Sequence, residues 1–316
     1  MRPLLALLAL ALIVTGCGRA AQAVDLVPAA AERSRQPVRA AGRIAYVAGG
    51  QVWEWSDGAT RPLTRPGVRY EGAAWSPDGQ RLAVSEVGDN HSDVWLLDAA
   101  GTRLRQLTRH WSLVSVQDSA WGRKAAWSPS GETLAYVSDL GRTDMSLWLV
   151  GAQGNNPRPI YRLGRGSGGI DWPSWSPDGK KIAFAAYPPG PYRSPQVFVL
   201  TIATGAVTQL TELKDGAFDP AWSPDGSAIA LAGRSDGRTN LIVMKPDGSG
   251  LLRLTDGRAE RAPAWSPDGD EIAYLALANG SFDLWAVRLQ GGAVSEPRAL
   301  TGKQNADAVS GISWTE

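Results

Sequence analysis

The sequence predicts an all-β fold, a six-bladed β-propeller built from four-stranded antiparallel blades. Three observations predict it. A Trp-Ser-Pro-Asp-Gly turn recurs at intervals of 43–52 residues, the same order of short strands follows each copy, and the last strand of the chain matches the strand that the first unit lacks. Four strands in roughly 45 residues is the period of a propeller blade.

The repeated turn occurs in five full copies, one of which has Ser130 in place of the aspartate. Proline presets φ for a tight turn, aspartate can bond its own backbone, and glycine accepts a positive φ. We expect the tryptophan of each copy to pack between neighbouring blades, because burying an aromatic side chain removes roughly 150–250 Å² from water. These residues are Trp75, Trp127, Trp175, Trp222, Trp265 and, in a truncated sixth copy, Trp314.

An apolar second strand follows each turn, and a third strand and a short fourth strand come after it. The fourth strand usually ends in Leu-Thr, as at Leu107-Thr108. Apolar and β-branched runs of this length, bounded by glycine-containing turns, are typical of strands. The second strands are expected at 82–84, 134–136, 182–184, 229–231 and 272–274, and the third strands at 93–97, 147–150, 197–200, 241–244 and 284–287.

The two ends of the repeat region complement each other. The first unit begins with a second strand at 42–47, continues with strands at 51–55 and 61–64, and has no tryptophan strand before it. The chain ends in a lone first strand at 311–315. We therefore expect the C-terminal strand to join the N-terminal blade and close the ring, which leaves no open strand edge. The propeller domain then covers residues 42–316.

Residues 1–16 are predicted to be a lipoprotein signal peptide. The apolar run at 4–14 is too short to span a bilayer, which needs roughly 20 residues, and fits the hydrophobic region of a secretory signal. The run ends in Val14-Thr15-Gly16-Cys17, which resembles the bacterial lipobox and contains the only cysteine of the chain. The alternative is an ordinary signal peptide cleaved after Ala23. We expect Cys17 to be lipidated, which places the protein outside the cytoplasm on a membrane anchor.

Residues 17–41 are predicted to be the lipidated cysteine and a flexible tether. This segment is rich in Ala, Arg, Gln and Pro, and it has no sustained apolar period. The alternative to a fully flexible tether is one that contains a short helix over residues 29–35.

Composition excludes several classes of function. Without Arg2, the chain keeps 31 basic and 31 acidic residues, so it lacks the basic excess typical of a nucleic-acid binder. One cysteine cannot form an intramolecular disulfide. His91 and His110 are the only histidines, and we expect solvated loop residues rather than a metal centre at His91. No cofactor is predicted, and we expect a monomer.

The turn, followed by Ile-Ala-Phe or Ile-Ala-Tyr, resembles the repeat of the TolB-like propeller family over residues 42–316. The resemblance implies six blades. It also implies a periplasmic role in partner binding, because the namesake binds a peptidoglycan-associated lipoprotein and translocation partners. A tether is expected here where the namesake has a separate α/β domain. Similar repeats occur in propellers of prolyl-oligopeptidase-like enzymes, but the chain has no Gly-x-Ser-x-Gly elbow.

One face of the propeller is expected to carry the tight turns, and the other face the long loops and the connections between blades. Variable loops on a rigid scaffold commonly carry function, so we expect a partner to bind at the loop-rich face and the channel mouth. The candidate contacts lie at or near the position four residues before each repeated tryptophan: Arg69, Tyr70, Glu71, Trp111, Trp121, Arg123, Asp171, Trp172, Phe218, Asp219, Arg261 and Asp307. Ser310 occupies the sixth such position.

The leading hypothesis is a non-enzymatic envelope lipoprotein that binds a protein or peptide partner. A second hypothesis is a propeller enzyme of the lactonase or carbohydrate lyase type, with Glu71, Asp171 or Asp219 as acid–base groups. A third is a carbohydrate-binding protein with Trp111, Trp121 and Trp172 as stacking platforms. Fold alone does not choose among them.

Overall fold

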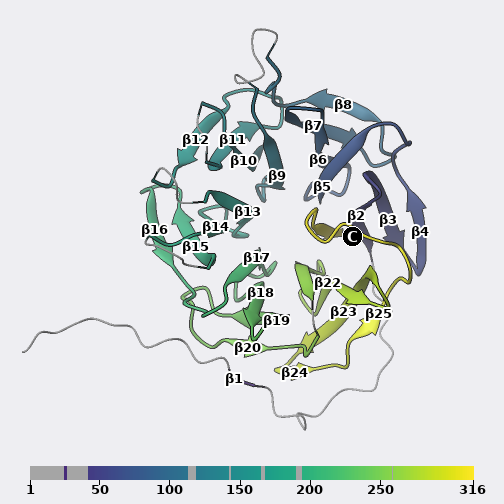
Figure 1. Ribbon diagram of the computed structural model, residues 1–316, viewed down its shortest axis with the longest axis vertical. Coiled ribbons are helices and arrows are strands. Elements are labelled where there is room, and N and C mark those ends of the chain that lie inside the picture. Colours follow the sequence, from purple (N-terminus) through teal and green to yellow (C-terminus); the bar gives the residue numbers. More distant parts are fainter. Residues whose placement is uncertain are drawn as a thin grey trace, which may run out of the picture.

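The structure, a computed structural model, describes residues 25–26, 42–112, 119–141, 144–164, 168–189, 194–257 and 259–316. Six separate sheets stand around a central axis (Figure 1), and the described residues form strands and no helix. The predicted six-bladed propeller is therefore confirmed. None of the described segments is a helix with the length and apolarity needed to cross a membrane.

The first three blades come from the N-terminal half and the C-terminal strand. From the axis outward, blade 1 is β26 (Ile312–Thr315), β2 (Arg43–Ala48), β3 (Gln51–Ser56) and β4 (Ala59–Pro62). Blade 2 is β5 (Arg69–Trp75), β6 (Arg81–Val87), β7 (Ser92–Asp98) and β8 (Arg103–Gln106). Blade 3 is β9 (Gly122–Trp127), β10 (Thr133–Ser138), β11 (Ser146–Gly151) and β12 (Arg158–Tyr161).

The other three blades follow in chain order. Blade 4 is β13 (Ile170–Trp175), β14 (Lys181–Ala186), β15 (Gln196–Thr201) and β16 (Ala206–Gln209). Blade 5 is β17 (Ala217–Trp222), β18 (Ile229–Ser235), β19 (Arg238–Met244) and β20 (Leu252–Arg253). Blade 6 is β21 (Glu260–Trp265), β22 (Glu271–Ala278), β23 (Ser281–Gln290), β24 (Ala293–Val294) and β25 (Arg298–Ala299).

The C-terminal strand closes the ring as expected. β26 pairs antiparallel with β2, and Trp314 lies opposite Ile44 in this ladder. The indole of Trp314 is buried in a cluster that joins blade 1 to blade 6 through Ala264 and Leu275. One short strand therefore supplies both backbone hydrogen bonds and core packing between the two ends of the chain.

The repeated tryptophans hold neighbouring blades together, as the sequence predicted. The indole N–H groups of Trp127, Trp175 and Trp265 donate to backbone oxygens of the preceding blade at 3.0–3.2 Å. The guanidinium of Arg43 lies 4.3 Å from the ring centroid of Trp75 in the next blade, which is a cation–π contact.

In the blades that have a Leu-Thr pair, the fourth strand ends at the residue directly before the leucine. The threonine hydroxyl then accepts a hydrogen bond from a backbone N–H of the third strand. Thr108 accepts from Val94 at 2.9 Å, and Thr211 accepts from Val197 at 2.9 Å. The strand is shorter than the sequence predicted because a side-chain oxygen replaces the next rung of the ladder.

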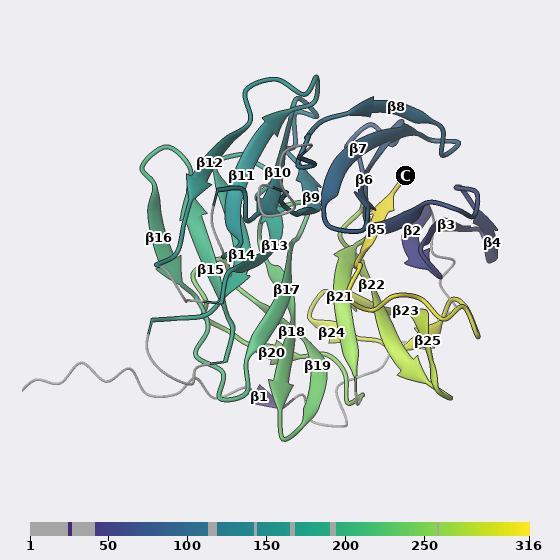
Figure 2. The ribbon, with the colours of Figure 1, turned by 45° about the horizontal axis from the view of Figure 1, so that its top comes forward.

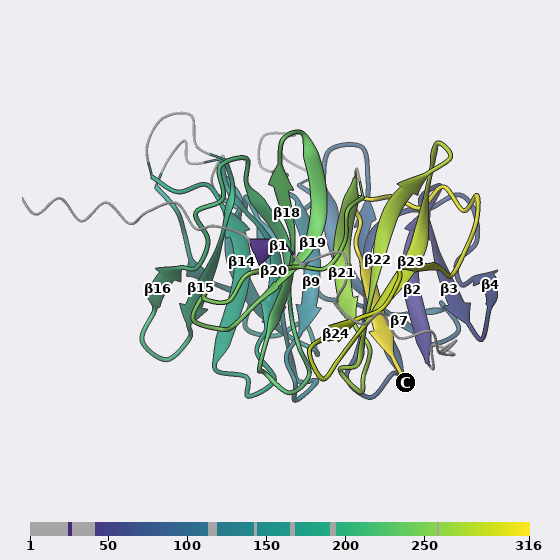
Figure 3. The same cartoon turned by 90° about the horizontal axis from the view of Figure 1, so that it is seen from below.

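The two faces of the disc differ as expected from the strand directions (Figure 3). The Trp-Ser-Pro-Asp-Gly turns join first to second strands, so they lie on the face where β26 ends. The loops between second and third strands and the connections between blades lie on the opposite, loop-rich face. In the tilted view, the inner strands β9, β13, β17 and β21 lie around the central axis (Figure 2).

The predicted signal peptide, Cys17 and the helix considered over 29–35 lie outside the described residues. Within the predicted tether, β1 (Asp25–Leu26) is described. It pairs parallel with β20, with Asp25 opposite Leu252, and adds a strand to the outer edge of blade 5.

Candidate functional site

The inner strands carry a bulge at the same register in five blades. In β5, β9, β13, β17 and β21, the ladder to the second strand shifts three or four residues before the repeated tryptophan. The residue three positions before the tryptophan has a positive φ in all six blades, for example +53° at Lys124 and +52° at Asp219. A bulge re-aims side chains, and here it turns this residue toward the channel.

These six residues line one central cavity and form what we call the channel ring. Two are glycines, one is an alanine, and three have larger side chains. The members in blade order are Gly311, Gly72, Lys124, Trp172, Asp219 and Ala262. The ring residues of blades 6, 1 and 2 therefore have small side chains or none. Those of blades 3, 4 and 5 are lysine, tryptophan and aspartate, which fill the channel.

The indole of Trp172 crosses the channel. Trp172 belongs to blade 4, yet it packs against the core cluster of blades 1 and 6, and a Cβ atom at Gly311 of blade 1 would overlap its ring. The ammonium of Lys124 lies 3.8 Å from the centroid of this indole. Trp172 and Lys124 together divide the channel into two cavities, since both residues line both of them.

The cavity on the face with the tight turns has a volume of about 430 Å³ and is lined by the inner ends of all six blades. The second cavity, of about 310 Å³, lies on the loop-rich side between blades 3 to 6, and we call it the mouth cavity. Four candidate residues from the position before the channel ring line the mouth cavity: Arg123, Asp171, Phe218 and Arg261. Met145, Ile170 and Tyr187 add apolar surface.

Two of the arginines in this region are held by carboxylates of the preceding blades. Arg261 makes a bidentate ion pair with Asp219, with N–O distances of 2.6 and 3.0 Å, and Asp219 is 2% exposed. Arg123 lies 3.5 Å from Glu71. The guanidinium of Arg261 also lies 5.3 Å from the ring of Phe218. These pairs fix the walls of the mouth cavity, and they occupy Glu71 and Asp219.

Lys124 and Asp171 are differently placed. In the part of the chain that the structure describes, neither side chain takes part in an ion pair, although Asp171 accepts a bond from the N–H of Trp172 at 2.9 Å. Burial lowers the pKa of the Lys124 ammonium, and nearby Asp171 opposes this shift. The same loss of hydration disfavours the charged form of Asp171 and so raises the pKa of its carboxyl. Solvent still reaches this carboxyl through the mouth. The mouth cavity therefore presents an ammonium group and a carboxyl group that form no ion pair with a described residue.

Comparison with known proteins assigns the family. The family model described as the TolB beta propeller domain matches residues 142–313, which is more than half of the chain. The chain belongs to the TolB β-propeller family. A curated relative, the protein TolB homolog of Chlorobium luteolum, is 33% identical over 195 residues, which cover 61% of this chain and 41% of the relative. The chain spans less than half the length of the curated relatives it matches.

Solved structures share this TolB-type propeller fold. TolB from Acinetobacter baumannii superposes with a TM-score of 0.71 at 18% identity, over 88% of this chain and 68% of that one. A putative TolB from Agrobacterium tumefaciens gives 0.66 at 19% identity, over 87% and 99% of the two chains. At these identities the likeness concerns the fold.

The remaining candidate residues are scattered around the TolB-type propeller. Tyr70 is 4% exposed and packs in the core of blades 1 and 2, so it does not reach the channel. Asp307 accepts bonds from Ser310 and from the N–H of Val309, which shapes the segment before β26. Arg69 is exposed beside Gly50.

The three tryptophans considered for sugar stacking do not share one surface. Trp111 is 55% exposed. One face of Trp121 is covered by the guanidinium of Arg123 at 4.7 Å, and one face of Trp172 is covered by Lys124.

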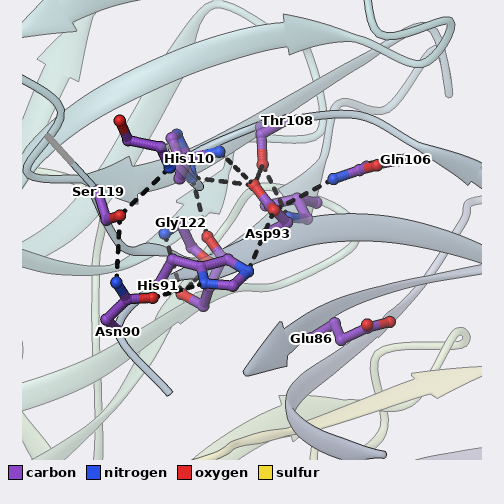
Figure 4. A network of polar contacts seen from close by, with 12 residues as sticks. Glu86, Asn90, His91, Asp93, Gln106, Thr108, His110, Ser119 and Gly122 are labelled. Carbon is purple, nitrogen blue, oxygen red and sulfur yellow. Dashed lines mark hydrogen bonds and ion pairs between the residues drawn. The ribbon is translucent and has the colours of Figure 1, made fainter. Parts of the chain in front are cut away.

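The two histidines meet at one carboxylate between blades 2 and 3 (Figure 4). Asp93 accepts bonds from the hydroxyl of Thr108 and the N–H of His110 at 3.0 and 2.7 Å. His91 lies 3.9 Å from the other oxygen of Asp93. His110 is buried and donates to the carbonyl of Ser92 at 2.9 Å, so it fills the space between blades and does not offer a partner contact. No group of three potential metal ligands occurs among the described residues.

Sequence reasoning named two members of the channel ring, Trp172 and Asp219, but it missed Lys124 and the shared register that makes the six residues a ring. It selected the position four residues before each repeated tryptophan. Because of the bulge, the residue that faces the channel is the next one in the chain, three residues before the tryptophan. The available signal was glycine at Gly72 and Gly311, since glycine tolerates a positive φ at no steric cost. Two glycines at one register of the repeat indicate a bulge or bend at that position of the repeat unit.

The contact between Trp172 and Gly311 leads to a stability prediction. Gly311→Ala should lower the free energy of unfolding by about 2–4 kcal/mol, because alanine is strained at φ +81° and its Cβ overlaps the indole. Urea denaturation measures the loss. Gly49→Ala is the matched control, since Gly49 has φ +58° and no atom within 4 Å of its Cβ position. Equal losses in both variants would contradict the crossing of the channel by Trp172.

Proposed function

We propose that the protein is an exported, lipid-anchored and non-enzymatic envelope protein that binds a protein or peptide partner through the mouth cavity. The observation that carries the proposal is the convergence of four blades there. Arg123, Asp171, Phe218 and Arg261 line one cavity together with Lys124, whose ammonium lies over the indole of Trp172. The proposed export is supported by the signal-like segment and by the family of the propeller, and the proposed anchor by the lipobox-like residues before Cys17 alone.

The shape of the mouth cavity favours a short segment of a partner as its occupant. Its volume of about 310 Å³ admits side chains or a chain end rather than a folded domain. Phe218, Trp172 and the 41% exposed Tyr187 provide aromatic surface, and such residues are frequent anchors of binding energy. Lys124 and Asp171 can then bond polar groups of the bound segment.

The carboxylates of this region support binding more than acid–base chemistry. Glu71 and Asp219, two of the three groups considered for catalysis, are held by Arg123 and Arg261. A general acid or base must reach the proton it transfers, and an arginine-paired carboxylate is poorly placed for that role. Asp171 is the one unpaired carboxyl of the three among the described residues.

The test is capture of a partner by crosslinking on intact membranes, followed by affinity purification. Phe218→Ala combined with Asp171→Asn should reduce recovery of the crosslinked partner at least tenfold, because an aromatic anchor and a polar contact are lost together. Asp236→Asn, an exposed change in the β18–β19 turn, should leave recovery unchanged. Equal recovery by the mouth variant would refute the proposed site.

These substitutions are preferable to charge reversal of the arginines. Arg261→Glu would place a second carboxylate against the buried Asp219 and disturb the fold. Phe218→Ala and Asp171→Asn leave that ion pair in place, so a loss of capture reports on the surface of the mouth cavity.

A further inference from the structure

A third cavity, of about 420 Å³, lies between blades 5 and 6, away from the channel. Its walls come from the end of blade 5 at 253–257, from the first residue of β21, from β22 and β23, and from residues 294–297. It shares no lining residue with the mouth cavity or with the central cavity. We call it the rim cavity, and its volume falls within the range of small-molecule sites, roughly 300–1,000 Å³.

The rim cavity lies beside a tyrosine whose counterparts in two other blades contact a side chain of the incoming connection. Tyr46, Tyr136 and Tyr274 occupy the same register of the second strand in blades 1, 3 and 6. The hydroxyl of Tyr46 donates to Gln304 at 3.0 Å, and Tyr136 lies beside the ring of His110 at 6.1 Å. Both of those partners come from the connection that leads into the blade.

Tyr274 has no such neighbour in the described part of the chain. The connection into blade 6 is short, from Thr255 to Glu260. The side chain of Tyr274 is 1% exposed, lines the rim cavity, and its hydroxyl makes no hydrogen bond to a described residue. Because the hydroxyl lines the rim cavity and no described residue bonds it, it can form a hydrogen bond with a ligand.

Glu260 is the second unusual group of the rim cavity. The same register holds Tyr70, Gly122, Ile170, Ala217 and Val309 in the other blades, so no other copy has a carboxyl there. Glu260 is 4% exposed and accepts bonds from the hydroxyl of Thr255 and the N–H of Leu241. Among described residues, no cation lies within ion-pair distance of it, and a buried carboxylate favours a positively charged partner.

The other charged groups that line the rim cavity have interaction partners of their own. Arg253 pairs with Asp256 at 2.8 Å, and Glu296 lies on the outer rim with an interaction of its own. Leu254, Trp285 and Val294 provide apolar and aromatic walls. An aromatic wall beside a carboxyl is the combination that recognises organic cations.

We propose that the rim cavity binds a small amphipathic amine, with its ammonium group against the carboxylate of Glu260 and its apolar body against Tyr274, Trp285 and Leu254. This site is independent of the mouth cavity, and neither proposal requires the other.

The pH dependence follows from Glu260. Burial raises the pKa of its carboxyl to about 7, and only the ionised form pairs with an ammonium group. The affinity for an amine should therefore be full above that pH and fall about tenfold between pH 8 and pH 6, since roughly a tenth of the carboxyl is ionised one unit below its pKa. The hydroxyl of Tyr274 stays protonated over this range, because burial raises its pKa.

The experiment compares 2-phenylethylamine with its neutral isostere 2-phenylethanol by isothermal titration calorimetry at pH 8. The amine should bind the full chain at least tenfold more tightly than the alcohol. Glu260→Gln should remove that difference and the pH dependence, because the glutamine keeps the hydrogen bonds but not the charge. Glu132→Gln, an exposed change in blade 3, should preserve both.

A second variant locates the site without touching the carboxyl. Ala276→Phe fills the rim cavity from β22 and should abolish binding of both compounds while circular dichroism shows an intact fold. Absence of amine binding to the natural sequence, amine binding that survives Ala276→Phe, or an unchanged preference in Glu260→Gln would each overturn the proposal.

Discussion

Trp314→Ala should lower the free energy of unfolding by about 3–5 kcal/mol, the loss expected for deleting a large buried aromatic side chain. Trp314 is 9% exposed and lies in the cluster that joins blades 1 and 6. Trp314 has the largest side chain of this four-residue strand, so it supplies much of the apolar surface that β26 can bury. Guanidinium denaturation followed by tryptophan fluorescence and by circular dichroism measures the change.

Trp111→Ala is the matched control for this experiment. Trp111 is 55% exposed, and its removal should change stability by less than about 0.5 kcal/mol, as surface substitutions usually do. A loss at Trp314 no larger than that at Trp111 would mean that closure by β26 does not hold the ring.

Asp219→Ala should cost about 3–5 kcal/mol, because it leaves the guanidinium of Arg261 without its partner in a largely buried position. Asp219 also accepts a bond from the N–H of Ala262 at 3.0 Å, so one side chain anchors two successive residues of β21. The loss should appear as a lower urea midpoint with an unchanged slope.

Asp236→Ala separates the ion pair from the backbone effect. Asp236 has φ +51°, nearly the value of +52° at Asp219, but it lies in an exposed turn. Both variants place alanine in the left-handed region, so their difference reports the contacts of the Asp219 carboxylate with Arg261 and with the N–H of Ala262. A double-mutant cycle with Arg261→Ala should show a coupling of about 1–3 kcal/mol, and a coupling near zero would contradict the pairing.

The rim cavity and the mouth cavity arise from the same cause. A repeat protein fills each equivalent position with a similar residue, and a departure from the repeat leaves space or an unmatched charge. Lys124 replaces the small residues found at Gly72 and Gly311, and Glu260 replaces apolar side chains or glycine. Residues that break the local rule of a repeat are good candidates for function, even where, as at Glu260, they also accept hydrogen bonds from the protein.

The sequence by itself determined the number of blades, the order of strands within each blade and the closure of the ring. Turns and apolar strands depend on neighbours in the chain, and five copies of one pattern repeat the same local information. For this reason the second and third strands lie where they were expected. The interblade role of the repeated tryptophans could be predicted on the same basis.

Only the tertiary structure decided which side chains face the channel and which charges meet. A bulge shifts the register by one residue, which moves the channel ring to Lys124 and Trp172. The pairing of Arg261 with Asp219, the crossing of Trp172 to Gly311 and the space beside Glu260 all join different blades. Such contacts depend on how rigid sheets are placed around an axis, and the local pattern of a single repeat does not contain that information.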